Sequence, residues 1–185
     1  MGFFITFIIF IIVIIFIFSS KKFSPIPYFP SQPVDLPLII KALNLKNNQT
    51  IIDLGAGDGI VIFRAAEEAN KKKLNTQFVA VEINPVLIFV LHLRRLFHSN
   101  RKNIKIIRGD IFKINISSLV PNPYSLTVYL YISPWFLEKT IENCLSDEAL
   151  AKVDKLQFIS YMYPIKSLKK NEKIIQGKNK IFIYG

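Results

Sequence analysis

The chain has 185 residues, 51% of them hydrophobic, and a formal net charge of +11. This length is enough for one domain with a sizeable core and a short appendage. The single cysteine, Cys144, excludes an internal disulfide and fits a reducing compartment. With His92 and His98 as the two histidines, the sequence predicts no metal site. The excess of Lys and Arg favours a membrane surface, a nucleic acid or an acidic partner without choosing among them.

Residues 3–18 form an apolar run interrupted only by Thr6. With the two residues before it, the uncharged stretch is about 18 residues long and would rise about 27 Å as a helix, close to the hydrocarbon thickness of a bilayer. The run lacks the polar face of a core helix and the basic start and cleavage site of a signal peptide. We therefore expect residues 1–20 to form a retained transmembrane anchor. Lys21 and Lys22 follow it, so the positive-inside rule places the rest of the chain on the cytoplasmic side.

Residues 21–37 are rich in proline, which disfavours a continuing helix and favours extended backbone. This segment has two interpretations: a semi-rigid linker from the membrane to the domain, or a lid in which Tyr28 and its neighbours fold over a ligand. A helix over 33–43 is expected to lead into the main domain, which we place at residues 38–185.

The chain is organised around a glycine-rich turn at residues 55–59, Gly-Ala-Gly-Asp-Gly, between an apolar strand ending at Asp53 and Leu54 and an apolar helix. Glycine is needed where the backbone takes positive φ or approaches a ligand closely. A turn that leads into a helix N-terminus favours a polar or anionic ligand group. The dinucleotide fingerprint would need glycine at position 60, which is Ile60, so a nicotinamide-dependent oxidoreductase is disfavoured.

Two further strands, expected over 77–82 and 104–110, also end in carboxylates. Glu82 lies about twenty residues after the turn, where such folds bind ribose hydroxyls. Asp110 suits an adenine amine, with Ile111 packed on the ring, although a single Gly-Asp pair is also a common turn. Three acids at one edge of a parallel sheet predict one binding site. The helix between these strands is almost wholly apolar over 86–97 until Arg94, so we expect most of it to be buried.

The second half of the chain is expected to hold strands over 125–131 and 156–162, a helix over 134–145, and a hairpin of 173–176 with 180–184. Together these elements predict an α/β fold, with a mostly parallel Rossmann-like sheet, helices on both faces and a C-terminal antiparallel hairpin. Tyr131 and Trp135, at the end of the fourth strand, and Tyr28 are candidates for lining an acceptor slot. The alternatives for this segment are core packing or a simple helix start.

The pattern Asp-x-Gly-x-Gly-x-Gly resembles the first motif of class I S-adenosylmethionine-dependent methyltransferases. The order of an apolar anchor, Pro-Tyr-Phe-Pro, Asp-Leu-Gly-Ala-Gly-Asp-Gly, Val-Glu-Ile-Asn-Pro, Gly-Asp-Ile-Phe and Tyr-Leu-Tyr-Ile-Ser-Pro covers nearly the whole chain. This order resembles the small membrane-anchored protein-lysine methyltransferases, whose mitochondrial members modify the adenine nucleotide translocase and the c-subunit of ATP synthase. The resemblance implies S-adenosylmethionine as the cofactor and, in a eukaryote, the mitochondrial inner membrane as the location.

By position, the resemblance implies that the glycines of the turn lie against the amino-acid end of the cofactor, which Asp53 would orient. Glu82 would bind the ribose and Asp110 the adenine. The full set of cofactor-binding candidates is Asp53, Gly55, Ala56, Gly57, Gly59, Glu82, Ile83, Asp110 and Ile111. The chain departs from the family at Ile60, where the family has arginine, and at Ser133-Pro134-Trp135-Phe136; both departures concern the acceptor more than the cofactor.

Three functions follow as hypotheses. The first is N-methylation of lysine in a membrane-associated protein, in which a desolvated aromatic slot lowers the amine pKa and no catalytic base is assigned. The second is methylation of amines in RNA or DNA, since Ser133-Pro134-Trp135-Phe136 is a near match to the motif of such enzymes and the basic surface suits phosphates. The anchor argues against this second hypothesis. The third is a membrane-tethered module that binds a nucleotide-like ligand without turnover.

Overall fold

The computed structural model describes residues 2–20, 26–116, 118–120, 125–145, 153 and 155–185. One seven-stranded sheet, in the order β3-β2-β1-β4-β5-β7-β6, runs through the domain. The first five of these strands are parallel, whereas β7 pairs antiparallel with both β5 and β6. The mostly parallel sheet and its C-terminal hairpin are therefore confirmed. The strand bounds are β1 Gln49–Leu54, β2 Gln77–Glu82, β3 Ile104–Arg108, β4 Ser125–Leu130, β5 Lys155–Tyr161, β6 Glu172–Gln176 and β7 Lys180–Tyr184.

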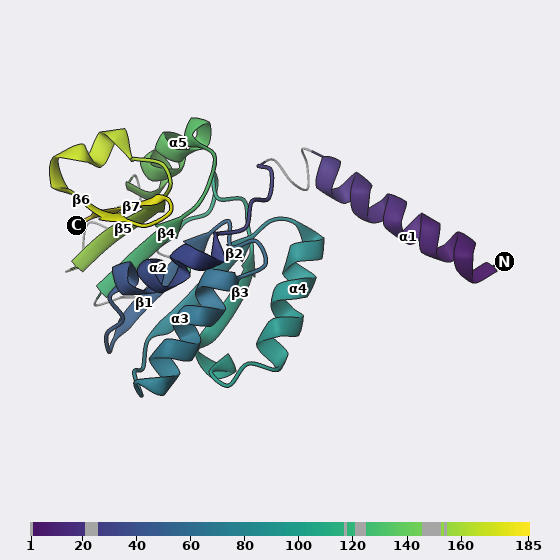
Figure 1. Ribbon diagram of the computed structural model, residues 1–185, viewed down its shortest axis with the longest axis horizontal. Coiled ribbons are helices and arrows are strands. Elements are labelled where there is room, and N and C mark those ends of the chain that lie inside the picture. Colours follow the sequence, from purple (N-terminus) through teal and green to yellow (C-terminus); the bar gives the residue numbers. More distant parts are fainter. Residues whose placement is uncertain (1, 21–25, 117, 121–124, 146–152, 154) are drawn as a thin grey trace.

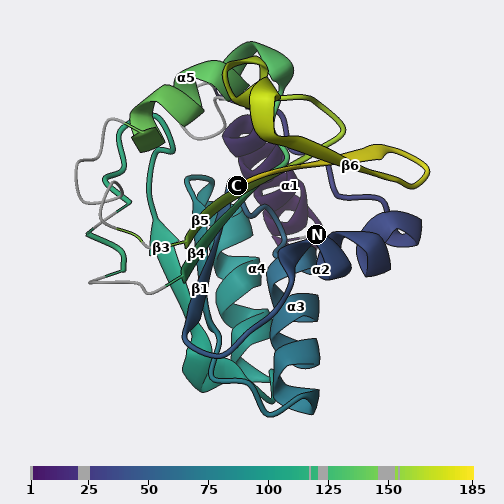
Figure 2. The same ribbon diagram turned by 90° about the vertical axis from the view of Figure 1, so that its left-hand side faces the viewer.

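Helices cover both faces of this sheet, as predicted (Figure 2). The helices α2, α3 and α4 lie on one face and α5 on the other, while α1 extends away from the domain (Figure 1). Their bounds are α1 Gly2–Ser19, α2 Leu36–Leu43, α3 Ile60–Lys71, α4 Pro85–Leu96 and α5 Pro134–Leu145, with short 3-10 helices η1 Pro33–Asp35, η2 Arg101–Asn103 and η4 Lys166–Asn171.

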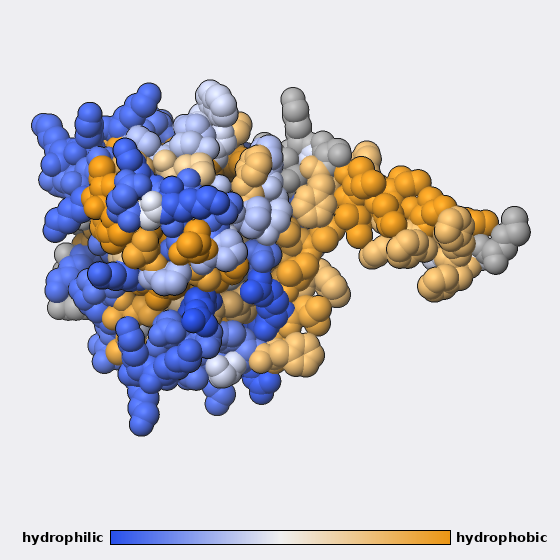
Figure 3. All heavy atoms as spheres, viewed as in Figure 1, coloured by the Kyte–Doolittle hydropathy of each residue, from blue (hydrophilic) through white to orange (hydrophobic). Residues whose placement is uncertain are grey.

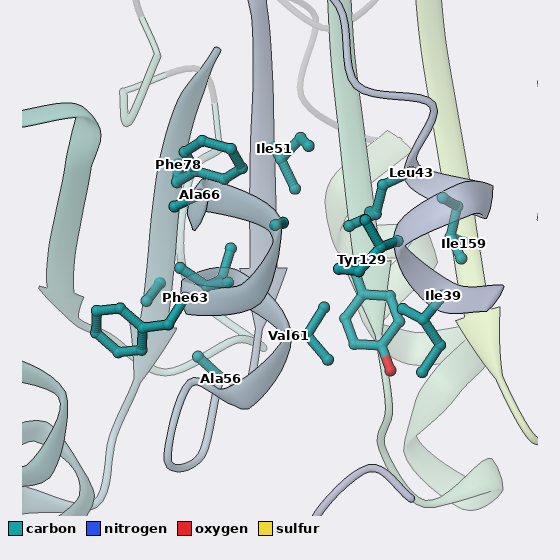
Figure 4. Close-up of a cluster of buried hydrophobic side chains, with 14 of the residues drawn as sticks. Ile39, Leu43, Ile51, Ala56, Val61, Phe63, Ala66, Phe78, Tyr129 and Ile159 are labelled. Atoms are coloured by element: carbon teal, nitrogen blue, oxygen red, sulfur yellow. The ribbon is translucent and has the colours of Figure 1, made fainter. Parts of the chain in front are cut away.

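The core has two layers because alternate side chains of each central strand face opposite sides of the sheet. In β1, Ile51 packs with the helices α2 and α3, whereas Ile52 packs with α5 on the other side. Both side chains are fully buried. Figure 4 shows the first layer, in which Ile39 and Leu43 of α2 approach Tyr129 of β4. Burial on both faces explains why two successive residues of β1, Ile51 and Ile52, are both apolar instead of alternating with polar ones.

Helix α4 departs from the expectation that most of it is buried. Only Leu87 and Leu91 are buried in this helix. Outside them, Phe89 is 67% exposed, Leu93 48%, Leu96 59% and the following Phe97 81%. The prediction was wrong because α4 packs beside β3, the strand at the edge of the sheet, and the side chains on its outer side are left exposed.

Helix α1 is apolar along its length, and most of its described side chains are exposed. It touches the domain at α4. Within the described residues, no helix combines the length and the hydropathy that a membrane crossing needs, so the transmembrane anchor expected for residues 1–20 is not confirmed.

A buried carboxylate fastens the segment before α2 to the C-terminal hairpin. Asp35, 1% exposed, accepts hydrogen bonds from the Tyr161 hydroxyl at 2.7 Å, the Lys178 amide at 2.7 Å and the Asn179 amide at 2.9 Å. Burial raises the pKa of Asp35, but the hydrogen bonds from Tyr161, Asn179 and Lys178 outweigh it and hold the pKa below its usual range. The carboxylate therefore stabilises the fold in its ionised form.

Replacing this carboxylate should destabilise the protein in a pH-dependent way. Asp35→Asn leaves buried donors without acceptors, and we expect the free energy of unfolding to fall by about 3 kcal/mol in a urea titration at neutral pH. Because the pKa of Asp35 is lower in the folded state, its contribution is fully present above about pH 4 and is lost as the pH falls through the folded pKa. The free energy of unfolding of Asp35→Asn should therefore fall less on acidification than that of the wild type.

The matched control is Lys178→Ala, which keeps the backbone amide that binds Asp35 and removes only an exposed side chain. Its stability should equal that of the wild type. Equal stability of Asp35→Asn and the wild type at neutral pH would show that the hairpin does not depend on this carboxylate.

Candidate functional site

The carboxyl ends of β1, β2, β3 and β4 and the segment before η1 line one cavity. The strand order reverses between β1 and β4, which is where open α/β sheets bind their ligands. The lining residues come from the linker, the glycine turn and the ends of the strands: Ile26, Pro27, Tyr28, Phe29, Gly55, Gly57, Glu82, Ile83, Leu87, Gly109, Asp110, Ile111, Tyr131 and Ile132.

The glycine turn is fixed to β2 by its own amides. The amides of Gly55 and Ala56 donate to the Val81 carbonyl at 3.0 and 2.9 Å, and the amide of Gly57 donates to Glu82 Oε2 at 2.8 Å. Gly57 has φ +59°, and a Cβ added there would lie 2.6 Å from the Tyr28 ring. Position 57 therefore requires glycine both for its backbone and for the close approach of the lid residue.

Glu82 is the carboxylate on which this turn rests. It is 8% exposed, and its Oε1 accepts from the amides of Ile83 at 2.8 Å and Asn84 at 2.9 Å, in addition to the bond from Gly57. A carboxylate offers about four acceptor positions. Three are filled by backbone amides, so Glu82 can accept one more hydrogen bond from a ligand in the cavity that it lines.

The neighbouring wall combines one carboxylate with apolar side chains. Asp110 Oδ1 accepts from the Phe112 amide at 3.0 Å, while Oδ2 lies 4.0 Å from the Lys113 ammonium. Ile83 and Ile111 line the cavity beside it. An amine-bearing flat ring suits this wall, because its edge can donate to the acid and its faces can pack on the isoleucines.

Three of the predicted cofactor-binding residues do not line the cavity. Asp53 lies behind the turn at 3% exposure, where burial raises its pKa and the charges of Glu82 and Asp58 raise it further. Ala56 is part of the hydrophobic core. Gly59 begins α3 with φ +77°, and a Cβ there would meet Leu91 and Phe63, so its place is fixed by helix packing.

The linker segment reaches the glycine turn through Tyr28. Burial raises the pKa of Tyr28 to about 12, and the charge of Asp58 and a hydrogen bond to it contribute to the rise. Asp58 in turn accepts from Arg94 Nη1 at 2.8 Å, and Arg94 also donates to the Asp58 carbonyl at 2.7 Å. Of the two interpretations of residues 21–37, the part from Ile26 to Phe29 lies where a lid would lie.

The aromatic slot candidates are divided between the cavity and the surface. Tyr28 and Tyr131 line the cavity, and Tyr131 packs edge-on against Tyr161 with ring centroids 4.8 Å apart. Trp135 is 86% exposed and lies outside it. Trp135 is the second residue of α5, a helix that turns Leu137 toward the core, so its own side chain is left at the surface.

Sequence reasoning missed several residues of the site. Leu87 and Ile132 line the cavity but have the pattern of ordinary core residues, so no sequence signal separates them. The pairing of Asp58 with Arg94 had a weak signal, since Arg94 is a cation within an apolar helix and needs a nearby partner.

Solved structures of other proteins share this fold. An RNA methyltransferase from Salinibacter ruber, solved with S-adenosyl-L-homocysteine, aligns with a TM-score of 0.64 and 17% identity over 84% of this chain and 92% of that chain. A precorrin-6y C5,15-methyltransferase from Geobacter metallireducens aligns with a TM-score of 0.56 and 14% identity over 84% and 91% of the two chains. At these identities the likeness concerns the fold.

The curated relatives of this chain are named either as ribosomal RNA methyltransferases or as protein-lysine methyltransferases. A probable ribosomal RNA small subunit methyltransferase A from Methanosarcina mazei is 35% identical over 96 residues, which are 50% of this chain and 32% of the relative. A lysine N-methyltransferase of the ATP synthase c-subunit from Caenorhabditis elegans is 30% identical over 109 residues, 56% and 52% of the two chains. A protein-lysine N-methyltransferase from Saccharolobus islandicus is 30% identical over 97 residues, 50% and 55%. The chain thus spans between a third and somewhat over half of these relatives.

The family model for ribosomal RNA adenine dimethylase matches residues 31–162. This stretch is well over half of the chain and includes β1 to β5, the glycine turn and the strand ends that form the cavity. The predicted resemblance to class I methyltransferases is confirmed, and the lysine-methylating type is among the relatives. The chain belongs to the ribosomal RNA adenine dimethylase family of class I S-adenosylmethionine-dependent methyltransferases.

Proposed function

We propose that this chain transfers a methyl group from S-adenosylmethionine to a lysine amine of a membrane-associated protein. The observation that carries the proposal is the wall of the cavity. Its aromatic part, Tyr28 and Phe29 with Tyr131, belongs mainly to the segment that follows the exposed apolar helix α1. If α1 enters a membrane, this aromatic part of the cavity wall lies close to the membrane surface, where a membrane-associated acceptor would reach it.

The residues that line the cavity fit the family's cofactor in chemistry. Glu82 has an acceptor position left for the ribose hydroxyls, Asp110 faces the same cavity for the adenine amine, and Gly55 and Gly57 let the amino-acid end approach the backbone. When bound, the cofactor supplies an activated methyl group on a sulfonium centre. Asp53 acts on this site only through the turn above it.

The aromatic wall suits a lysine acceptor. A lysine ammonium must lose its proton before it reacts, and the aromatic rings of Tyr28 and Tyr131 in the cavity wall would displace water and lower the pKa of an amine there. Tyr28 is not the base that removes the proton, because its pKa of about 12 keeps the phenol protonated at neutral pH. We therefore assign orientation and desolvation to the protein, and the proton passes to solvent.

RNA is the second candidate acceptor, supported by the family description and by four archaeal relatives named for ribosomal RNA. Enzymes that modify a base remove it from its stack and hold it between aromatic side chains. The aromatic residue after Pro134 in this chain is Trp135, which is exposed and away from the cavity. This placement favours the lysine amine over the base amine.

We further propose that α1 attaches the domain to a membrane. Apolar side chains surround this helix and leave it no polar face, and a helix of that kind is stable in lipid or in a protein core. Its described side chains are mostly exposed in the folded chain. Lys21 and Lys22 follow it in sequence, and this charge favours the cytoplasmic side for the domain.

Removing the charge of Glu82 should weaken cofactor binding. Glu82→Gln keeps the size of the side chain but loses the charge, and we expect S-adenosylmethionine to bind at least about tenfold more weakly in calorimetry, because a hydrogen bond to a charged group is lost. Glu67→Gln, an exposed substitution on α3, is the matched control and should bind normally. Unchanged affinity in Glu82→Gln would remove this residue from the site.

The acceptor can be identified by tracing a labelled methyl group. The full chain, incubated with tritiated S-adenosylmethionine and either native membranes or ribosomes, should label a membrane protein band that a protease destroys and a nuclease leaves intact. Mass spectrometry of that band should place the methyl group on lysine. Label in nuclease-sensitive material would establish the RNA acceptor instead, and cofactor binding without any transfer would establish a non-catalytic module.

A further inference from the structure

The outer side of α4 is an apolar stripe on the surface of a folded domain. We call Phe89, Leu93, Leu96 and Phe97 the outer face of α4. Their spacing of four, three and one residues places them on one side of a helix, opposite the buried Leu87 and Leu91. A contiguous exposed apolar patch of this kind marks a site of interaction with a protein or a membrane.

This outer face continues the apolar surface of α1. The two helices touch, and the space-filling view shows apolar side chains running from α1 onto the adjoining edge of the domain (Figure 3). Helix α1 points away from the domain while α4 runs across its edge (Figure 1). A membrane into which α1 inserts by its end would therefore also contact α4 along the length of that helix.

The charge around the outer face selects the kind of surface. Residues 85–107 contain no Asp or Glu, and basic side chains stand at the C-terminal end of α4. Arg94 is held by Asp58, and Arg95 by the Ile104 carbonyl. Arg101 and Lys102 of η2 are exposed, and Arg101 also donates to the Leu96 carbonyl at 3.3 Å. Apolar side chains bordered by cations match an anionic bilayer, in which acyl chains lie below negative headgroups.

We propose that the outer face of α4 lies flat against an anionic lipid bilayer, as a second membrane contact beside α1. This inference rests on the proposed attachment through α1 and adds an orientation to it. A second copy of this chain is the main rival occupant of the face. The formal net charge of +11 and the cations at the border of the face oppose such self-association.

This orientation would also connect the membrane to the binding cavity. Arg94 lies between Leu93 and Leu96 in sequence and holds Asp58 of the glycine turn through two hydrogen bonds. Docking of α4 thus fixes the distance between the glycine turn and the bilayer surface. Acceptor groups at the level of the lipid headgroups would then reach the cavity more readily than groups far from the membrane.

An environment-sensitive dye at position 97 tests the docking in the full chain. Phe97→Cys provides one reactive thiol, because Cys144 is 1% exposed. An NBD dye on the introduced thiol should shift its emission to shorter wavelength when phosphatidylcholine–phosphatidylglycerol vesicles are added, and lipids carrying nitroxide groups should quench it. Ile174→Cys, an exposed apolar site on β6 at the opposite end of the domain, is the matched control and should show neither change (Figure 1).

The contribution of charge has its own test. In the dye-labelled protein, Arg101→Gln and Lys102→Gln should each lower the ratio of docked to undocked domain on phosphatidylglycerol-containing vesicles by about fivefold, and should have little effect on pure phosphatidylcholine.

Vesicle flotation of the same samples separates the possible failures. If the protein floats with vesicles and the dye at position 97 keeps its aqueous emission, the proposed docking of α4 is overturned while attachment through α1 stands. If the protein does not float, the attachment through α1 and the docking of α4 both fail. The proposed methyl transfer is then still decided by the labelling experiment. A spectral shift that depends on protein concentration without vesicles, with a dimer in ultracentrifugation, would assign the face to a second copy and overturn the bilayer contact.

Discussion

A single buried carboxylate decides whether the binding site exists. Glu82 accepts three backbone amides, from Gly57, Ile83 and Asn84, and so joins the glycine turn to the end of β2. Without these bonds the turn would have orphaned donors in a nearly dry place, which costs about 1–3 kcal/mol for each group left unpaired. The same acid lines the cavity, so the group that builds the wall is also one that meets the ligand.

From that turn, contacts lead outward to the lid and to α4. Asp58 connects to Tyr28 on one side and to Arg94 on the other, so a short chain of polar contacts crosses from the linker to the edge helix. Asp35 performs a similar task at the far side of the linker, where it joins η1 to the C-terminal hairpin. Within the described part of the linker, carboxylates therefore hold two points, Tyr28 through Asp58 and the C-terminal part through Asp35, and Tyr28 and Phe29 line the cavity.

Much of this architecture was predictable from local sequence, and the rest depends on tertiary placement. Mostly apolar runs that lead to Glu82 and Asp110 predict two neighbouring parallel strands, and the carboxyl ends of such strands meet at one edge of the sheet. The exposure of Phe89 and Trp135 was not predictable, since hydrophobic composition gives burial only when another element covers the side chain. The bond between Asp35 and Lys178 joins residues 143 positions apart, and no local pattern contains it.

The error about α4 carries physical information. A domain that leaves four large apolar side chains uncovered on one helix loses the hydrophobic stabilisation that burial of those side chains would give, about 1.5–3 kcal/mol for each one fully buried. Selection for stability alone would replace them with polar residues at no cost to the core, because Leu87 and Leu91 already fill the inner side. Their presence is accounted for when a surface outside the chain supplies the missing burial. Because α1 touches α4 and its own apolar side chains are also exposed, one membrane can bury the apolar side chains of both helices.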